Sequence, residues 1–381
     1  MKAFKKILGL VFVVLFCVLL AISTNDKKED KKDNTIKVTT FITRDEKYDA
    51  AILSLSQEDF EKSGFILGDS VDVTFENGYT LTDIPYYNGY YVKTGYPLTV
   101  AYPGFDNVYI TFNNKGIFTD NGFKEGDSVT VTLNERGKYS PVQSSLGQIY
   151  SFNREDYESD EQFCNFRSIS VNGLTDNLIY RGASPIDNSR SRAAYTDSLL
   201  KQNNIRLVID LADTAEDFEN YRSKDDFSSY YFESLNNEGR VIFLGMGSSY
   251  ENIEYKESLV VGLREIDNSD GPIYIHCMEG KDRTGFVCML LGALSGGTYE
   301  DLKKDYMVTY RNYYDVDYET SPDKYDAIVD LYFDTFTEYL TGTDNIEDLK
   351  RADFLESARQ YLLSGGMSEI EIDQLKEFIS E

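Results

Sequence analysis

Residues 272–294 restrict the folds open to this chain more than any other stretch. The apolar run 272–275 predicts a buried strand, and the apolar pattern from Thr284 to Leu294 predicts a helix. Only a short loop, residues 276–283, separates the two. In such a strand–loop–helix turn, the backbone N–H groups of the loop and the positive end of the helix can surround a phosphate. The stretch therefore predicts a phosphate-binding turn within an α/β domain.

The loop itself carries reactive and phosphate-binding side chains. Its sequence runs His276-Cys277-Met278-Glu279-Gly280-Lys281-Asp282-Arg283-Thr284-Gly285, with five residues between the cysteine and the arginine. The positive field of the turn favours the thiolate form of Cys277, which is nucleophilic. Arg283 offers a planar fork of donors for two phosphate oxygens and for the charge that spreads over them in the transition state. We therefore expect Cys277 and Arg283 to be catalytic, in a cradle made by the backbone of Met278, Glu279, Gly280, Lys281, Asp282 and Arg283.

The loop resembles the signature of the protein tyrosine phosphatase superfamily. The string HCxxGKDRTG is similar to that of the atypical bacterial tyrosine and lipid phosphatases, which carry a lysine and an aspartate inside the loop. Flanking segments that resemble the same family are Asn165–Arg167, Tyr180–Ser184, Leu207–Asp213 and Asp305–Met307. The resemblance covers roughly residues 150 to 381. It implies an α/β cysteine-phosphatase domain that works through a phosphocysteine intermediate, without a metal or another cofactor.

Residues around the cysteine have supporting roles in this interpretation. His276, the single histidine of the chain, matches a family position that orders the loop and tunes the thiol. A histidine at a strand end without a role is the alternative. The hydroxyl of Thr284 would donate a hydrogen bond to the departing thiolate in the second step. By resemblance Arg181 lines the pocket, and a surface ion pair is the alternative.

Hydrolysis also needs a general acid that protonates the leaving oxygen. Many tyrosine phosphatases hold this aspartate on a Trp-Pro-Asp loop, but the chain contains no tryptophan. The resembling bacterial phosphatases have an aspartate at the position of Asp282, which is our first choice. Asp213, which follows the predicted strand 206–211, is the second choice for the general acid. Asp210 or another acidic residue is a further alternative. Asp282 has an alternative role, which is to hold its basic neighbours in place.

Two loop residues favour different substrates. Lys281 adds positive charge beside the phosphate and favours substrates with neighbouring phosphates, such as phosphoinositides or inositol phosphates. Glu279 opposes them, because a carboxylate at the rim repels a second phosphate. The expected substrate is a phosphorylated tyrosine in a protein, and a phosphoinositide or inositol phosphate is the alternative. Two other functions use a similar loop: sulfur transfer, and binding of a phosphorylated ligand without turnover.

Residues 35–146 show short alternating strands between Gly, Asn and Asp turns, which predicts an all-β accessory domain. An internal repeat favours a barrel, since the segment Gly64–Thr74 recurs as Gly122–Thr132, 58 residues further on. Each copy is a Gly-Asp turn that leads into an alternating strand. The repeat predicts a duplicated small β-barrel, and two ordinary matching turns are the alternative. The region also contains a cluster of four tyrosines, Tyr86, Tyr87, Tyr90 and Tyr91. We expect them to pack in the core, and binding of a glycan or peptide is the alternative.

Residues 150–381 alternate between strand and helix patterns, which predicts an α/β domain with a helical C-terminal part. Buried strands are expected at 206–211, 240–244 and 273–275. The predicted helices are 255–266, 299–308, 323–339, 345–363 and 368–380. Because open α/β sheets bind ligands at the carboxyl ends of their strands, we expect the phosphate loop at that edge.

The first residues predict export. Three lysines precede the apolar stretch Ile7–Ile22, and small residues at 21 and 23 fit a signal peptide, residues 1–23, that is cleaved after Ser23. An uncleaved anchor is the alternative and the only expected route to membrane contact. Residues 24–34 form a charged linker. We therefore expect a secreted or cell-surface protein.

The net charge limits the binding partners, and the number of cysteines limits the disulfides. A formal net charge of −27 argues against nucleic acid and against docking on an anionic membrane. Once the signal peptide is removed, Cys164, Cys277 and Cys288 are left, an odd number that cannot form a complete set of disulfides. Cys288 is expected in the core. Cys164 is expected to be an unpaired structural cysteine, with a resolving thiol for Cys277 as the alternative.

Overall fold

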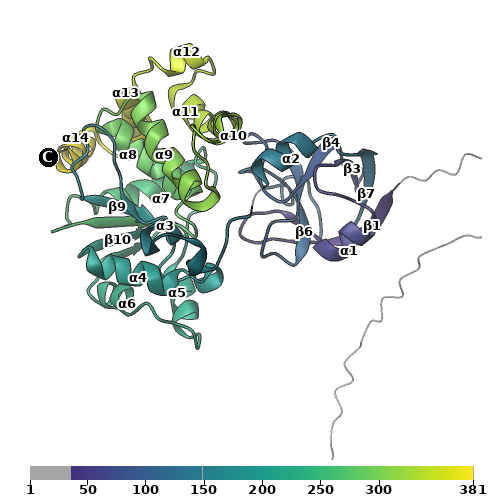
Figure 1. Cartoon of the computed structure of the whole chain (residues 1–381), viewed down its shortest axis with the longest axis horizontal. Helices are drawn as coiled ribbons and strands as arrows, with labels where there is room; N and C mark the ends of the chain where they lie inside the picture. The colour runs from purple at the N-terminus through teal and green to yellow at the C-terminus, as the bar shows by residue number, and fades with distance from the viewer. Residues whose placement is uncertain (1–35, 148, 381) are drawn as a thin grey trace, which may run out of the picture. The chain divides into compact units, whose positions relative to one another are not determined.

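The structure is a computed structural model that describes residues 36–147 and 149–380. The predicted signal peptide (1–23) and charged linker (24–34) lie outside the described residues. Two sheets organise the described chain, a closed barrel of strands β1 to β7 and a five-stranded sheet of β8 to β12 (Figure 1). This arrangement confirms the predicted fold class, an all-β region followed by an α/β fold with C-terminal helices. In the described part, no helix is both long and apolar enough to cross a membrane.

Alternating apolar side chains close the N-terminal barrel. Its strands are β1 (Lys37–Arg44), β2 (Ala51–Ser56), β3 (Ser70–Phe75), β4 (Thr80–Tyr87), β5 (Pro97–Val100), β6 (Asn107–Phe112) and β7 (Ser128–Glu135), with the short helices α1 (Gln57–Lys62) and α2 (Ser140–Leu146). The strand order is β1-β2-β6-β5-β4-β3-β7, and β7 pairs with β1 to complete the barrel. On β3 and β7, every second residue points into the interior: Val71, Val73, Val129 and Val131 are buried there. Removing these side chains from water stabilises the closed form.

The internal repeat forms two equivalent turns. β3 and β7 lie side by side and antiparallel. Gly68 and Gly126 precede them with φ angles of 91° and 88°, a left-handed conformation that favours glycine. The next residues, Asp69 and Asp127, each accept a hydrogen bond of 2.8 Å from the amide three residues earlier. Both copies therefore begin their strands in the same way, as the predicted duplication requires.

The second sheet has the order β11-β10-β12-β9-β8. Its strands are β8 (Arg167–Ser168), β9 (Ile179–Gly182), β10 (Leu207–Asp210), β11 (Val241–Phe243) and β12 (Ile273–His276). Strands β9 to β12 are parallel, and the edge strand β8 is antiparallel to β9. Side chains alternate between the two faces, so Ile273 and Ile275 pack into one core and Tyr274 into the other. Both faces are therefore covered, as parallel sheets require.

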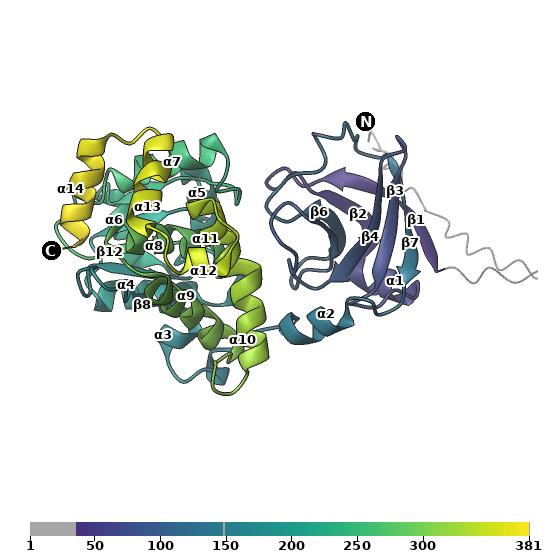
Figure 2. The same ribbon diagram turned by 90° about the horizontal axis from the view of Figure 1, so that it is seen from above.

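Helices surround this sheet (Figure 2). The core that contains Tyr274 includes α3 (Asp160–Phe163), α4 (Ala193–Gln202), α5 (Ala215–Arg222) and α6 (Tyr230–Asn237). The core that contains Ile273 includes α7 (Ile253–Leu263), α8 (Asp282–Leu294), α9 (Tyr299–Tyr314), α10 (Pro322–Ile328), the π-helical turn η3 (Val329–Phe333), α11 (Asp334–Thr341), α12 (Ile346–Leu349), α13 (Phe354–Ser364) and α14 (Glu369–Ile379). Two 3₁₀ turns, η1 (Arg154–Asp156) and η2 (Asn188–Arg190), complete the list.

The predicted strands of this region agree with the observed ones to within one residue at each end, whereas four predicted helices differ. The predicted helix 255–266 is α7, which spans Ile253–Leu263. The predicted helix 345–363 is two helices, because Asp353 caps a new start at α13 by accepting the Glu356 amide at 3.0 Å. The predicted helix 323–339 contains the π-helical turn η3. Helix α9 runs past 308 and stops where Asp315 adopts a φ of 52°.

Candidate active site

The loop between β12 and α8 lies at the carboxyl end of the parallel sheet, where open α/β sheets bind ligands. Glycine is required at its bend. Gly280 has a φ of 63°, and a Cβ at this position would lie 2.2 Å from the carbonyl oxygen of Gly182 on β9. Any side chain would therefore push the loop off the neighbouring strand.

The carbonyl groups of the loop are held from outside. Three successive carbonyl oxygens accept hydrogen bonds: that of Met278 from the Ser184 amide (3.0 Å), that of Glu279 from the Tyr313 hydroxyl (2.8 Å), and that of Gly280 from the side chains of Arg181 and Asn165 (3.0 and 3.1 Å). In a planar trans peptide, the N–H of the following residue points the opposite way. Within residues 36–147 and 149–380, the amides of 278–281 find no acceptor in the protein. These N–H groups can therefore bind an oxyanion on the inner side of the loop, as the predicted cradle requires.

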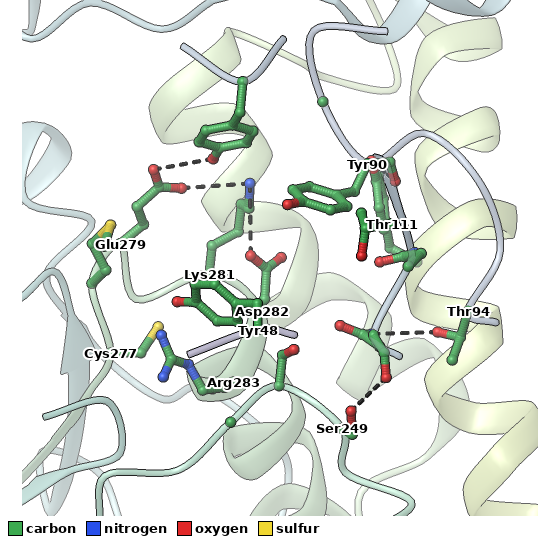
Figure 3. Close-up of a pocket in the computed structure, with 18 of the residues that line it drawn as sticks. Tyr48, Tyr90, Thr94, Thr111, Ser249, Cys277, Glu279, Lys281, Asp282 and Arg283 are labelled. Carbon is green, nitrogen blue, oxygen red and sulfur yellow. Dashed lines mark hydrogen bonds and ion pairs between the residues drawn. The ribbon is translucent and has the colours of Figure 1, made fainter. Parts of the chain in front are cut away.

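Cys277 and Arg283 lie together on that inner side. Figure 3 shows the guanidinium group of Arg283 beside the sulfur of Cys277. Both side chains are buried, and Arg283 Nη1 donates a hydrogen bond of 2.7 Å to the carbonyl oxygen of Met246. Burial opposes the charge of Arg283, but the attraction of Cys277 and further acidic groups outweighs it and raises the pKa of Arg283. The arginine therefore keeps its charge next to the thiol.

His276 and Asp210 are fully buried beneath the loop. One carboxylate oxygen of Asp210 accepts hydrogen bonds from the amides of Ala212 and Asp213 (2.9 and 3.0 Å), and the other lies 3.6 Å from His276 Nε2. Burial lowers the pKa of His276 to about 4, so its ring is neutral at neutral pH, and burial raises the pKa of Asp210. His276 Nδ1 lies 3.3 Å from the carbonyl oxygen of Cys277, a position from which the ring can order the loop.

The two candidate acids lie in different places. Asp282, the first residue of α8, lines a cavity over the loop, and its side chain is 60% exposed there. The surrounding protein limits its hydration and raises the pKa of Asp282, although Lys281, 3.9 Å away, partly offsets the effect. Asp213 is buried, and burial together with Asp210 raises the pKa of Asp213 to about 7. Of the two acids, only Asp282 lines the cavity with Cys277.

Glu279 is buried, and four neighbours balance its charge. It accepts hydrogen bonds from the hydroxyls of Tyr150 and Tyr102, the latter at 3.4 Å, and it lies 3.5 Å from Lys281 Nζ and 3.6 Å from Arg190 Nε. Burial by itself raises the pKa of Glu279, but these partners outweigh burial and lower the pKa below its usual range. The repulsion of a second phosphate predicted from the sequence is therefore largely neutralised.

Arg181 does not lie where it was predicted, and Thr284 does not form its predicted hydrogen bond in this structure. Arg181 is 1% exposed, ion-pairs with Asp305 at 3.1 Å and donates to the Gly280 carbonyl. It therefore neither lines the cavity nor forms a surface ion pair, and it supports the loop from behind. Thr284 is buried, and its hydroxyl has no hydrogen-bond partner among the described residues. Its predicted hydrogen bond to Cys277 is not formed here and stays a prediction for the second step.

The other two described cysteines are buried and free. Burial raises the pKa of Cys164 to about 12 and that of Cys288 to about 11. Cys288 packs in the same core as Cys277, whereas Cys164 packs in the core on the opposite face of the sheet. Both settings are typical of structural cysteines.

The cavity over the loop has a volume of about 740 Å³. Residues 36–381 form one compact unit, and side chains of the barrel line this cavity together with the loop (Figure 3). The four tyrosines of the predicted cluster lie in two different places. Tyr86 and Tyr87 are buried, whereas Tyr90 and Tyr91 line the cavity. Across the described ranges, no three His, Cys, Asp or Glu side chains gather as a metal site would need.

Five groups that act on the loop were not predicted from the sequence. They are the Met246 carbonyl and the side chains of Tyr102, Tyr150, Arg190 and Tyr313. A backbone carbonyl leaves no side-chain signal. Tyr102 lies in the β-rich region, and Tyr150 and Arg190 lie outside any recognisable motif, so only their contacts reveal their roles.

A search of curated proteins finds no match. Among solved structures, an uncharacterized conserved protein from Thermotoga maritima is 17% identical, with a TM-score of 0.22; the match covers 25% of this chain and 35% of that protein. TpbA from P. aeruginosa is 15% identical, with a TM-score of 0.23, over 55% of this chain and 91% of TpbA. A model of the tyrosine phosphatase family matches residues 161–381, which is more than half of the sequence. The chain therefore belongs to the tyrosine phosphatase family.

Proposed function

We propose that this protein is an exported, cysteine-dependent phosphatase that hydrolyses phosphotyrosine-type monoesters through a phosphocysteine intermediate. Its family makes it a phosphoric monoester hydrolase. The observation that carries the finer proposal is the loop, whose carbonyls are held outside while Cys277 and Arg283 lie together inside. Inward amides and a guanidinium would bind the phosphoryl oxygens while the thiolate attacks phosphorus.

In the first step, the Cys277 thiolate attacks phosphorus. The sulfur–phosphorus bond forms, the bond from phosphorus to the leaving oxygen breaks, and that oxygen takes a proton from Asp282. Arg283 and the loop amides stabilise the charge on the non-bridging oxygens. Two observations support Asp282 as the acid: it lines the cavity with Cys277, and its raised pKa helps to keep it protonated.

In the second step, water hydrolyses the phosphocysteine. The water oxygen attacks phosphorus and gives a proton to the Asp282 carboxylate, and the sulfur–phosphorus bond breaks to release phosphate and the Cys277 thiolate. The unpartnered hydroxyl of Thr284 is a suitable donor to that thiolate.

The proposed substrate is a phosphorylated protein met outside the cell. Lys281 lies 3.5 Å from Glu279 and 3.9 Å from Asp282, so two carboxylates compete with any second phosphate for its charge. A phosphoinositide or inositol phosphate is the alternative substrate, because the loop still holds this lysine. Export is proposed from residues 1–23 alone.

Phosphate release and thiol labelling test this function together. We expect release of phosphate from phosphotyrosine peptides, and loss of that activity when iodoacetate alkylates the Cys277 thiolate. Inorganic phosphate should protect the enzyme, because it occupies the loop. A panel with phosphoinositides and inositol phosphates would rank the substrates. Sulfur transfer from thiosulfate to cyanide without phosphate release would contradict the proposal.

Asp282→Asn is expected to lower kcat by about 10²- to 10⁴-fold on an aryl phosphate with a poor leaving group, and far less on one with a good leaving group. Only the poor leaving group depends on a donated proton. The wild-type rate should fall as pH rises through the raised pKa of Asp282, since the acid must be protonated, and this decline should flatten in the variant. Asp213→Asn is the matched comparison. An equal loss of kcat on both aryl phosphates would show that another carboxyl group is the general acid.

A further inference from the structure

We propose that the barrel forms part of the substrate site: Tyr48 and Tyr90 contact the leaving group of the ester and make the enzyme selective for a flat aromatic group next to the phosphate. This inference rests on the proposed function, because it concerns the part of the same cavity that receives the leaving group. The family model begins at residue 161, so the barrel lies outside the segment that matches the family.

Both tyrosines line the cavity that contains the catalytic loop (Figure 3). Tyr48 lies in the connection between β1 and β2, and Tyr90 follows β4. Asp282 and Arg283 line the same cavity as the two tyrosines. The two rings therefore lie near the residues that would bind the phosphoryl group and protonate the leaving oxygen.

Tyr90 begins a row of aromatic rings on the barrel side of the cavity. Successive ring centroids are 5.8, 5.4 and 4.9 Å apart in the order Tyr90, Tyr102, Phe105 and Tyr109. All four residues line the cavity. Aromatic rings favour tilted and offset contacts with a further ring at such distances. The row thus offers ring faces and edges to a flat, apolar leaving group.

Contacts with the phosphatase fold are made by the backbone of Tyr90 and by Lys47, the neighbour of Tyr48. Lys47 Nζ, next to Tyr48, donates a hydrogen bond of 3.5 Å to the Ala212 carbonyl, and the Tyr332 hydroxyl donates one of 3.3 Å to the carbonyl oxygen of Tyr90. Neither Tyr48 nor Tyr90 makes a side-chain hydrogen bond within the described residues. In the part of the chain that the structure describes, replacing either ring therefore removes no hydrogen bond, and it removes only the contacts of Tyr48 with Lys47 and of Tyr90 with Tyr102.

Charge beside the phosphoryl site also favours a neutral leaving group. Lys281 faces the carboxylates of Glu279 and Asp282, and its Nζ lies 5.9 Å from the ring centroid of Tyr314. Because these partners already compensate the charge of Lys281, a second phosphate gains little attraction from it, and a neutral aromatic ring loses nothing.

Tyr90→Ala and Tyr48→Ala test the inference against Tyr96→Ala, since Tyr96 is 62% exposed on the barrel and does not line the cavity. We expect kcat/KM for a phosphotyrosine peptide to fall about 10- to 100-fold in each cavity variant and to stay unchanged in the control. The inhibition constant of inorganic phosphate should stay at its wild-type value, because phosphate alone contacts only the loop. Tyr90→Phe and Tyr48→Phe should keep the wild-type kcat/KM, because the ring makes the contact.

Three results would overturn the inference while the proposed function stands. The first is alanine variants that behave like the Tyr96→Ala control. The second is a parallel weakening of phosphate inhibition, which would mean that the loop itself is disturbed. The third is an equal loss of kcat/KM on an inositol polyphosphate, which has no aromatic ring. A wild-type chain that releases phosphate from none of these substrates would refute the proposed function and this inference with it.

Discussion

Cys277→Ser is expected to reduce phosphate release by about 10⁴-fold or more. A serine hydroxyl stays protonated at neutral pH and is a far weaker nucleophile than a thiolate. The loop amides and Arg283 are unchanged in this variant, so it should still bind inorganic phosphate with near wild-type affinity. Initial rates on a phosphotyrosine peptide and calorimetric titration with phosphate measure the two effects separately.

Two further variants test whether the loss of activity is specific to the Cys277 sulfur and the loop. Cys164→Ala removes a buried free cysteine in the other core and should keep the wild-type kcat for the folded protein. Arg283→Lys keeps a positive charge but loses the planar fork and the hydrogen bond to the Met246 carbonyl, so both turnover and phosphate binding should fall. Turnover by Cys277→Ser at the rate of the Cys164→Ala control would show that the sulfur is not the nucleophile.

Asp305→Asn is expected to lower the free energy of unfolding by about 3–5 kcal/mol. The Asp305 carboxylate lies 3.1 Å from Arg181 and 3.7 Å from Arg167, and the three side chains are 6%, 1% and 13% exposed. Asparagine has nearly the same shape without the charge, so the two buried arginines lose this counter-charge. The midpoint of thermal unfolding should fall by on the order of 10 °C, as calorimetry can measure.

Glu300→Gln is the matched control for this effect. Glu300 lies on the same helix, α9, and forms an exposed ion pair of 2.6 Å with Lys303. Its loss should cost less than about 1 kcal/mol, because the Glu300 carboxylate is 63% exposed and already solvated by water. Asp305→Asn should also reduce activity at temperatures where it is folded, since Arg181 holds the Gly280 carbonyl. Equal destabilisation by the two changes would contradict the role of the buried pair.

The loop and its flanking elements could be predicted from the sequence because they are adjacent in the chain. The strand ending at His276, the helix through Leu294 and the glycine at 280 each depend on local patterning and backbone conformation. The barrel was predictable for a similar reason, since the repeated Gly-Asp turn and the alternating strand after it are local signals. The break between α12 and α13 was missed, because the helical pattern hid the cap at Asp353.

The partners of the loop could not be predicted in the same way. Tyr102 is 177 positions from Glu279, Tyr150 is 129, and Arg181 is 99 from Gly280. Nothing local distinguishes Tyr102 and Tyr150 from other tyrosines, whereas the segment of Arg181 resembles the family and only its contact with the Gly280 carbonyl was not predicted. The choice between Asp282 and Asp213 also depends on which of them lines the cavity, and both follow predicted strands at the same sheet edge.

By itself, the sequence determined the cysteine proposed as the nucleophile, the arginine six positions later and the turn that joins them, since short-range geometry and chemistry suffice for these. Only the tertiary structure decided which side chains hold the loop carbonyls outward, which carboxyl lines the cavity, and that tyrosines of the barrel complete its wall. The physical reason is that contacts between distant residues follow from how sheets and helices bury their apolar faces together. That burial is non-directional and is summed over the whole core, so no local pattern encodes it.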